Sequence, residues 1–106
     1  MRLLLDESVP RRLRRSLLAH DVRTVVEMGW SGVRNGKLLL LAATAFDAFV
    51  TVDKNLPYQQ NPATLPIAVV VLDAASNELA ALLPLVDRLE ITLSSLVPCS
   101  CVRVAA

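Results

Sequence analysis

Short runs of uninterrupted apolar residues, separated mostly by helix-forming segments, constrain the fold of this chain more than any other feature. The clearest runs are Leu3–Leu5, Ala48–Val50 and Ile67–Leu72. Strands without polar alternation are typical of a parallel sheet that helices cover on both faces. The pattern predicts strands over residues 2–6, 22–26, 48–53, 67–72 and 97–104.

The segments between these runs are predicted to be helices and loops. Pro10 lies near the start of a first predicted helix that ends near residue 20, and Asn35 is the predicted N-cap of a second helix over 36–46. A third is expected to run to about residue 93, bent at Pro84. With its three prolines, the segment 54–66 is predicted to be a loop. Residues 1–106 are therefore expected to form a single three-layer α/β/α domain with a mainly parallel central sheet.

Composition narrows the class of protein but does not identify a ligand. The chain is 54% hydrophobic with a net charge of +1, so bulk charge gives no indication of nucleic-acid binding. Its longest apolar stretch, Leu38–Phe49, is interrupted by Thr44 and Asp47 and is shorter than the ~20 residues of a membrane span. No membrane association is expected. Together with an acid as early as Asp6, which argues against a secretory signal, this predicts a cytoplasmic protein with reduced cysteines.

Acidic residues follow two of the predicted strands. Asp6 and Glu7 come after the first strand and Asp53 after the third. The carboxyl ends of neighbouring parallel strands meet at one edge of the sheet, where ligands bind. Paired carboxylates there suit a hard cation such as Mg²⁺, which usually handles a phosphate. Because neighbouring residues alternate in direction, Asp6 is favoured over Glu7.

Other interpretations of these acids remain open at the level of sequence. Asp6 could simply cap the helix that follows, although Ser8 offers a cap, and Asp53 could simply form a turn. Thr51 shares one side of its strand with Asp53, and Asn55 continues the same side. Thr51 and Asn55 are therefore expected to support the acidic site.

Basic residues are concentrated in the first half of the chain. Four arginines fall within one short segment, which is either a phosphate-binding surface or the solvated face of a helix. The four arginines are Arg11, Arg12, Arg14 and Arg15. Arg34 and Lys37 are the next candidates for contacts with a nucleic acid.

Three segments together resemble the PIN-like superfamily, and more closely its short bacterial proteins of the DUF5615 type. They are Leu3-Leu4-Leu5-Asp6-Glu7, the glycine-containing loop Gly29–Gly36, and Val50-Thr51-Val52-Asp53-Lys54-Asn55 with the Leu-Pro-Tyr-Gln-Gln that follows. The resemblance implies a compact α/β/α domain, a Mg²⁺- or Mn²⁺-dependent ribonuclease, and the toxin of a toxin–antitoxin pair. It places the catalytic acids at Asp6 and Asp53, the metal ligands at these two and Glu7, and Lys54 beside RNA.

The chain departs from the pattern of this superfamily at two acids. A third acid is usual near Asn35 or Lys37, and a fourth often stands where this chain has Asn55. Asn35 and Asn55 are candidate supporting ligands, but amides carry no negative charge, so the ion is expected to be held weakly or not at all, with Glu27 as a substitute ligand. The alternatives are a degenerate module that binds RNA or a protein without cleaving, and a phosphoacceptor signalling domain. The apolar excess over 36–46 and 79–96 predicts a homodimer.

Overall fold

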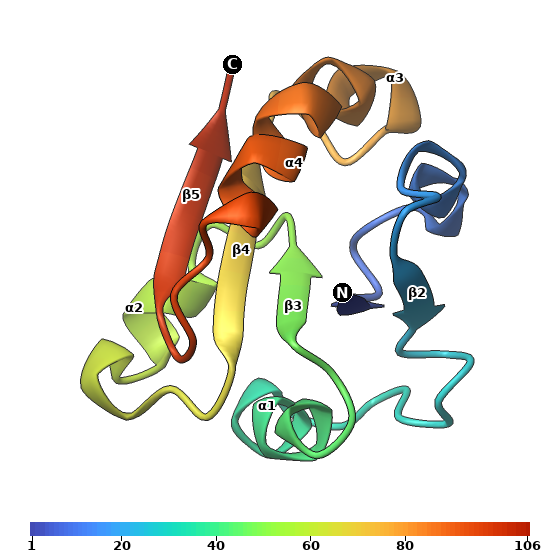
Figure 1. Ribbon diagram of the computed structural model, residues 1–106. Helices are drawn as coiled ribbons and strands as arrows, with labels where there is room; N and C mark the ends of the chain where they lie inside the picture. Colours follow the sequence, from blue (N-terminus) through green and yellow to red (C-terminus); the bar gives the residue numbers. More distant parts are fainter.

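The protein is built around a five-stranded sheet in which every strand runs parallel to its neighbours. The computed structural model describes residues 1–106, and the strand order is β2-β1-β3-β4-β5 (Figure 1). Parallel pairing joins each strand to the next, which confirms the expected α/β class. The strands are β1 (Arg2–Leu5), β2 (Asp21–Thr24), β3 (Ala48–Thr51), β4 (Ala68–Asp73) and β5 (Cys101–Ala105).

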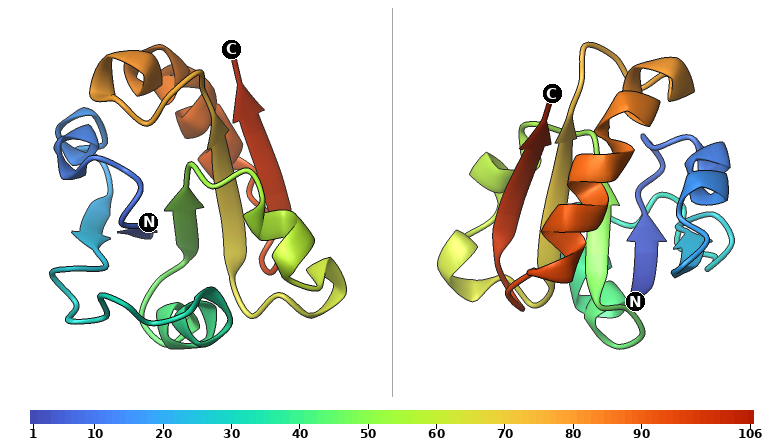
Figure 2. Two further views of the ribbon diagram at one scale, coloured as in Figure 1. Left: turned by 180° about the vertical axis from the view of Figure 1, so that it is seen from behind. Right: turned by 45° about the horizontal axis from the view of Figure 1, so that its top comes forward.

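Helical elements cover both faces of the sheet and give the three expected layers (Figure 2). One face carries η1 (Arg11–Ser16), α3 (Leu79–Leu82), η3 (Leu83–Leu85) and α4 (Val86–Ser94). The other face carries α1 (Asn35–Ala43), α2 (Leu56–Gln59) and η2 (Pro62–Thr64). The core is accordingly divided into two apolar clusters, one on each side of the sheet.

The uninterrupted apolar runs are explained by this burial on both faces. Successive side chains of a strand point to opposite sides, so Leu3 and Leu5 pack in the cluster under α4, whereas Leu4 packs in the cluster under α1. All three are fully buried. A polar residue at any of these positions would lie in the core, which is why the strands lack polar alternation.

The first predicted helix differs from the expectation. It is a short 3₁₀ helix, in which N–H groups bond to carbonyls three residues earlier, as Leu13 does to Pro10 at 3.0 Å. Ser8 does not cap it, because Pro10 occupies the N-cap position. Leu13 and Leu17 are both buried, and the segment ends before β2, which begins at Asp21.

Two other predicted helices have different bounds. Asn35 lies inside α1 and does not cap it; Arg34 is at the N-cap position, without a side-chain cap. The helix ends at Ala43, before the predicted residue 46, and the Thr44 hydroxyl donates to the Leu41 carbonyl at 2.6 Å. Around Pro84 the last helix is divided into α3, η3 and α4. The predicted loop 54–66 contains α2 and η2.

Candidate functional site

Asp6 and Asp53 follow two strands that lie side by side in the sheet. Strand β1 pairs with β3 in parallel, so both acids lie at the carboxyl edge, as the sequence predicts. The chain places β2 on one side of β1 and β3 on the other, so the strand order changes direction between β1 and β3. Such a switch point is where open parallel sheets bind their ligands.

A network of hydroxyl groups joins the two acids. Oδ2 of Asp6 accepts hydrogen bonds from Thr51 Oγ1 at 2.9 Å and from Ser8 Oγ at 2.7 Å. Thr51 Oγ1 in turn accepts from the backbone N–H of Asp53 at 3.0 Å. Thr51 is fully buried, and the N–H of Val52 donates to Ser8 Oγ at 3.4 Å. One buried threonine therefore bonds the carboxylate of Asp6 and the backbone of Asp53, but not the carboxylate of Asp53.

The turn after β3 sets the direction of Asp53. Its Oδ1 accepts from the N–H of Asn55 at 2.9 Å, an arrangement typical of an Asx turn. Lys54 extends toward β4, where its amine contacts Oδ1 of Asp73 at 2.8 Å and the Ala74 carbonyl at 3.0 Å. The amine of Lys54 is therefore occupied at β4, outside the hydroxyl network of the two acids.

Glu7 makes a separate contact beside the network. It is exposed, and Oε1 accepts from the N–H of Gly32 at 3.3 Å. Gly32 has a φ of 80°, a left-handed conformation that favours glycine. Glu7 thus ties β1 to the glycine-containing loop, and its carboxylate is not in the network around Thr51.

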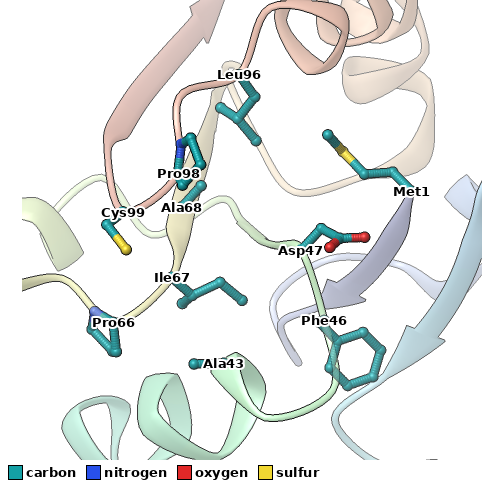
Figure 3. Close-up of a pocket in the computed structure, with 10 residues that line it drawn as sticks. All are labelled: Met1, Ala43, Phe46, Asp47, Pro66, Ile67, Ala68, Leu96, Pro98 and Cys99. Carbon is teal, nitrogen blue, oxygen red and sulfur yellow. The ribbon is translucent and has the colours of Figure 1, made fainter.

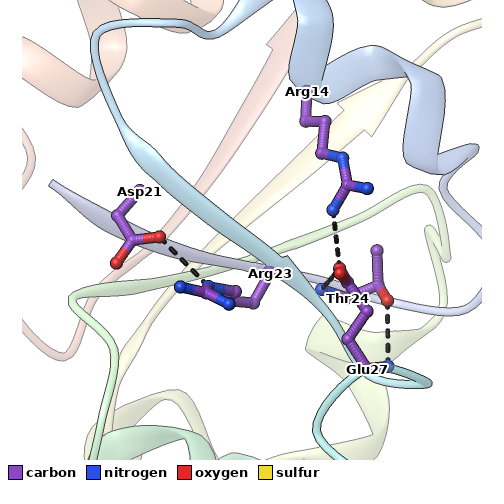
Figure 4. A network of polar contacts seen from close by, with 5 residues as sticks. All are labelled: Arg14, Asp21, Arg23, Thr24 and Glu27. Carbon is purple, nitrogen blue, oxygen red and sulfur yellow. Dashed lines mark hydrogen bonds and ion pairs between the residues drawn. The ribbon is translucent and has the colours of Figure 1, made fainter.

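Glu27 is engaged in a network of its own at the end of β2 (Figure 4). Its Oε1 accepts from the N–H of Thr24 at 3.0 Å and from Arg14 at 2.7 Å, while its own N–H donates to Thr24 Oγ1 at 3.1 Å. The hydrogen bonds from the Arg14 side chain and the Thr24 backbone hold the pKa of Glu27 below its usual value. These contacts give Glu27 a structural role and join η1 to the segment after β2.

The acidic residues only partly fit a divalent metal. No group of three or more His, Cys, Asp or Glu side chains converges in a way that could hold an ion. Oδ1 of Asp6 accepts no hydrogen bond from the protein, and neither does Oδ2 of Asp53. Mg²⁺ is often held through one or two carboxylates, with waters and substrate phosphates completing its shell. Asp6 and Asp53 supply two carboxylates at this edge, and no third acid joins them.

The two predicted amide ligands lie elsewhere. Asn55 is exposed at the start of α2. Asn35 is half-buried in a cleft of about 690 Å³ lined by residues of α1 and α2, among them Arg34, Lys37 and Gln60. Neither side chain hydrogen-bonds to Asp6 or Asp53. The structure therefore does not bring Asn35 into the acidic site.

Most of the predicted RNA-binding residues are free to meet a ligand. Arg14 is the exception in the arginine segment because it pairs with Glu27; Lys54 shares Asp73 with Arg103 but its side chain stays half exposed. The side chains of the others are exposed on η1 and on the first turns of α1: Arg11, Arg12, Arg15, Arg34 and Lys37.

The sequence did not predict the contacts of two further polar residues at this edge of the sheet. Ser8 was interpreted as a helix cap, yet its hydroxyl donates to Asp6. Asp73 ends β4 at the same edge as Asp6 and Asp53, and its carboxylate pairs with both Lys54 and Arg103. Its place directly after an apolar strand was the available signal. The hydrogen bonds from Lys54 and then Arg103 hold the pKa of Asp73 below its usual value.

The opposite edge of the sheet holds an apolar pocket with no part in this network (Figure 3). It measures about 300 Å³, and its lining includes Met1, Phe46, Ile67 and Cys99. Asp47 also lies there, as expected from its position before β3, and accepts from the N–H of Arg2 at 2.8 Å. That bond is the main reason why the pKa of Asp47 is lowered.

Comparisons with known proteins identify no relative. No protein-family model matches the chain, and neither a curated protein nor a solved structure matches it. None of its helices combines the length and the apolar character needed to cross a bilayer. Functional interpretation therefore depends on the geometry of the site and on the resemblance in sequence.

Proposed function

We propose that this protein is a PIN-like ribonuclease that depends on Mg²⁺ or Mn²⁺, with its site at Asp6 and Asp53. The observation that carries the proposal is the buried Thr51 hydroxyl, which donates to Asp6 and accepts from the N–H of Asp53. This hydroxyl orients the Asp6 carboxylate and fixes the backbone that leads into Asp53 at the switch point of the sheet, where ligands bind.

The residues of the site have distinct roles in this proposal. Asp6 and Asp53 hold the ion, with Glu7 as an outer ligand at the mouth of the site. A bound ion would supply a water ionised at neutral pH and charge to stabilise the phosphate. Ser8 and Thr51 fix the orientation of Asp6 by donating to Oδ2, which leaves Oδ1 for the ion.

Two carboxylates offset little of the dehydration cost of Mg²⁺, so the ion is expected to bind weakly without RNA. The RNA phosphate then completes the coordination shell. Exposed basic residues on η1 and α1 attract the RNA backbone. An activity of this kind belongs in the cytoplasm and would be masked by an antitoxin protein.

A second candidate is a module that binds RNA or a protein partner without cleaving. The observation that favours it is the lack of any group of three acids able to hold an ion. A phosphoacceptor function is disfavoured by residue types. Asp73 and Ala74 stand where that class needs a hydroxyl residue, and neither β5 nor Ala106 supplies a lysine.

Cleavage of labelled single-stranded RNA, with Mg²⁺ or Mn²⁺ and then with excess EDTA, tests the proposal. Wild type is expected to cleave only with metal, and Asp6→Asn or Asp53→Asn to reduce the rate by at least ~100-fold, the scale of a lost catalytic group. Asp87→Asn is the matched control, because Asp87 is exposed on α4 and takes part in no ion pair. Cleavage that persists in the Asp6→Asn, Asp53→Asn double variant would refute the site.

Calorimetry with Mn²⁺ separates the two candidates further. Weak binding that disappears in Asp6→Asn supports the nuclease. RNA binding by a wild-type protein that neither binds metal nor cleaves would favour the second candidate. Tight metal binding that survives both substitutions would show that the ion is held elsewhere.

A further inference from the structure

A cleft of about 300 Å³ lies directly beside the acidic edge, over the last two strands. Residues of β4 and β5 and of the segment around α2 line it: Lys54, Asn55, Pro57, Tyr58, Val71, Cys101 and Arg103. Pockets of this size are at the lower end of those that bind small ligands. It has the capacity for one planar group of the size of a nucleobase.

The cleft carries two cations that share a single acid. Lys54 contacts Oδ1 of Asp73 at 2.8 Å, and Arg103 Nε donates to Oδ2 at 2.6 Å. Asp73 is only 15% exposed, whereas the side chains of Lys54 and Arg103 are 52% and 68% exposed. One positive charge is therefore left over, and both cations are accessible to an anion from solvent.

Tyr58 provides an aromatic surface at the same place. It is 87% exposed, although large apolar rings are usually covered, and it belongs to the lining of the cleft. Exposed aromatic rings beside cations are the usual platform for single-stranded nucleic acids, whose bases stack on the ring while their phosphates meet the charges.

The cleft is continuous with the proposed site. Lys54 and Asn55 follow Asp53 directly, and the N–H of Asn55 donates to Oδ1 of Asp53. Thr51 of β3 pairs with Val71 of β4, which lines the cleft, and neighbouring strands are ~4.8 Å apart. If one nucleotide occupies the cleft, the next nucleotide of the same RNA chain would therefore be within reach of Asp6 and Asp53.

We propose that this cleft binds one nucleotide of a single-stranded RNA, with the base on Tyr58 and a phosphate at Lys54 and Arg103. The identity of the ligand as RNA rests on the proposed function. The subsite itself needs no metal and no cleavage, because it contains none of the acids that would hold the ion.

Fluorescence anisotropy with a labelled short oligouridylate, at low salt and in EDTA, tests the subsite apart from catalysis. Tyr58→Leu, which removes the ring but keeps an apolar side chain, is expected to weaken binding on the order of 10-fold. Tyr58→Phe is expected to bind like wild type. Arg103→Gln is expected to lower the salt slope of log K by about 0.7, the value for one phosphate contact with a single strand.

The matched control is Arg2→Gln, because Arg2 also pairs with an aspartate but lies at the opposite edge of the sheet. It is expected to leave both affinity and slope unchanged. Equal weakening by Arg2→Gln and Arg103→Gln would overturn the subsite, as would equal affinities of Tyr58→Leu and Tyr58→Phe. Thermal melting shows that each variant is folded before its affinity is compared.

Cys101 gives an independent readout because it lines the cleft. In a Cys99→Ser background, bound oligouridylate is expected to slow alkylation of Cys101 at least several-fold. Unchanged alkylation at saturating RNA would place the RNA elsewhere and overturn the proposal. RNA bound through Tyr58 by a protein that never cleaves would leave the subsite in place and refute the nuclease.

Discussion

Thr51 contributes to both stability and the arrangement of the acids, because its buried hydroxyl bonds on two sides. Thr51→Val keeps the shape but leaves the N–H of Asp53 without its acceptor and Asp6 with one donor fewer. Loss of a buried hydrogen bond to a charged group costs about 1–3 kcal/mol. We expect that decrease in the free energy of unfolding from urea titration, with Thr51→Ser, which keeps the hydroxyl, close to wild type. Equal losses in the two variants would contradict a role for the hydroxyl.

At the scale of residues, the sequence predicted positions better than contacts. Asp6 and Asp53 were placed correctly because parallel strands bring their carboxyl ends to one edge. The contact of Ser8 was not predicted, since a serine after a strand is equally suited to cap a helix or to bond an acid. The contact between Lys54 and Asp73 spans two strands, and no local pattern reports such a pairing.

Glu27 gives a stability that depends on pH. Its pKa is lowered, first by the Arg14 hydrogen bond, so the folded protein favours the charged form. The stabilisation that charged Glu27 gives the folded protein is present above pH 4.5, the ordinary pKa of the group. It is lost as the pH falls through the lower pKa of the folded state. We expect Glu27→Gln to cost about 0.5 kcal/mol at pH 7, the scale of an exposed ion pair, and less at pH 3.

Urea titrations at the two pH values measure this difference. Glu78→Gln serves as the control, because Glu78 is exposed and its carboxylate takes part in no ion pair. A cost of Glu27→Gln that persists unchanged at pH 3 would show that the side chain acts through its packing and not through its charge.

At the scale of elements, the strands were easier to predict than the helices. Apolar runs buried on both faces mark β1, β3 and β4 directly. The helical segments are short, and their form depends on distant contacts. Leu13 and Leu17 both pack into the core, and their i, i+4 spacing does not distinguish the observed 3₁₀ helix from the expected α-helix. Only the break at Pro84 had a clear local signal, the missing N–H of proline.

The basic face of η1 is an element whose role in RNA binding remains a prediction. Arg11 and Arg15 are exposed, whereas Arg14 is tied to Glu27. We expect the double substitution Arg11→Glu, Arg15→Glu to weaken binding of a longer single-stranded RNA on the order of 10-fold or more and to flatten its salt dependence. Anisotropy over a range of salt concentrations measures both. Charge reversal at Arg88 on α4 is the control. Unchanged RNA binding by the η1 variant would show that the basic face of η1 is exposed to solvent and does not contact RNA.

At the scale of the whole molecule, the alternation of strands and helices predicted the layers, whereas the pairing of β1 with β3 was not predicted from the sequence. The order of the sheet places β2 and β5 at its two edges. Sequence alone did not reveal the cleft over β4 and β5, because its lining needs Arg103 of β5 beside Lys54, which follows β3. These two residues are 49 positions apart in the sequence, and both contact Asp73 at the end of β4, the strand that lies between β3 and β5.

Association between copies of the chain is the remaining prediction at this scale. Most apolar residues of the last helical segment are buried, including Leu82, Leu85 and Leu89, so they belong to the core. Leu83 of η3 and Ile91 of α4 remain 45% and 68% exposed. We predict that the exposed surface of α4 around Ile91 forms the contact of a homodimer.

Light scattering at micromolar concentration measures the mass of the protein in solution and so distinguishes a dimer from a monomer. Wild type is expected at twice the 11.5 kDa of one chain, and Ile91→Glu at the mass of a monomer, because a charge in an apolar contact must be desolvated. Leu40→Glu is the matched control: Leu40 is 61% exposed on α1, which covers the other face of the sheet. A dimer that persists in Ile91→Glu but dissociates in Leu40→Glu would move the contact to α1. A wild-type mass near 11.5 kDa would refute the dimer, and Leu83 and Ile91 would then be ordinary exposed apolar residues, which occur singly on most protein surfaces.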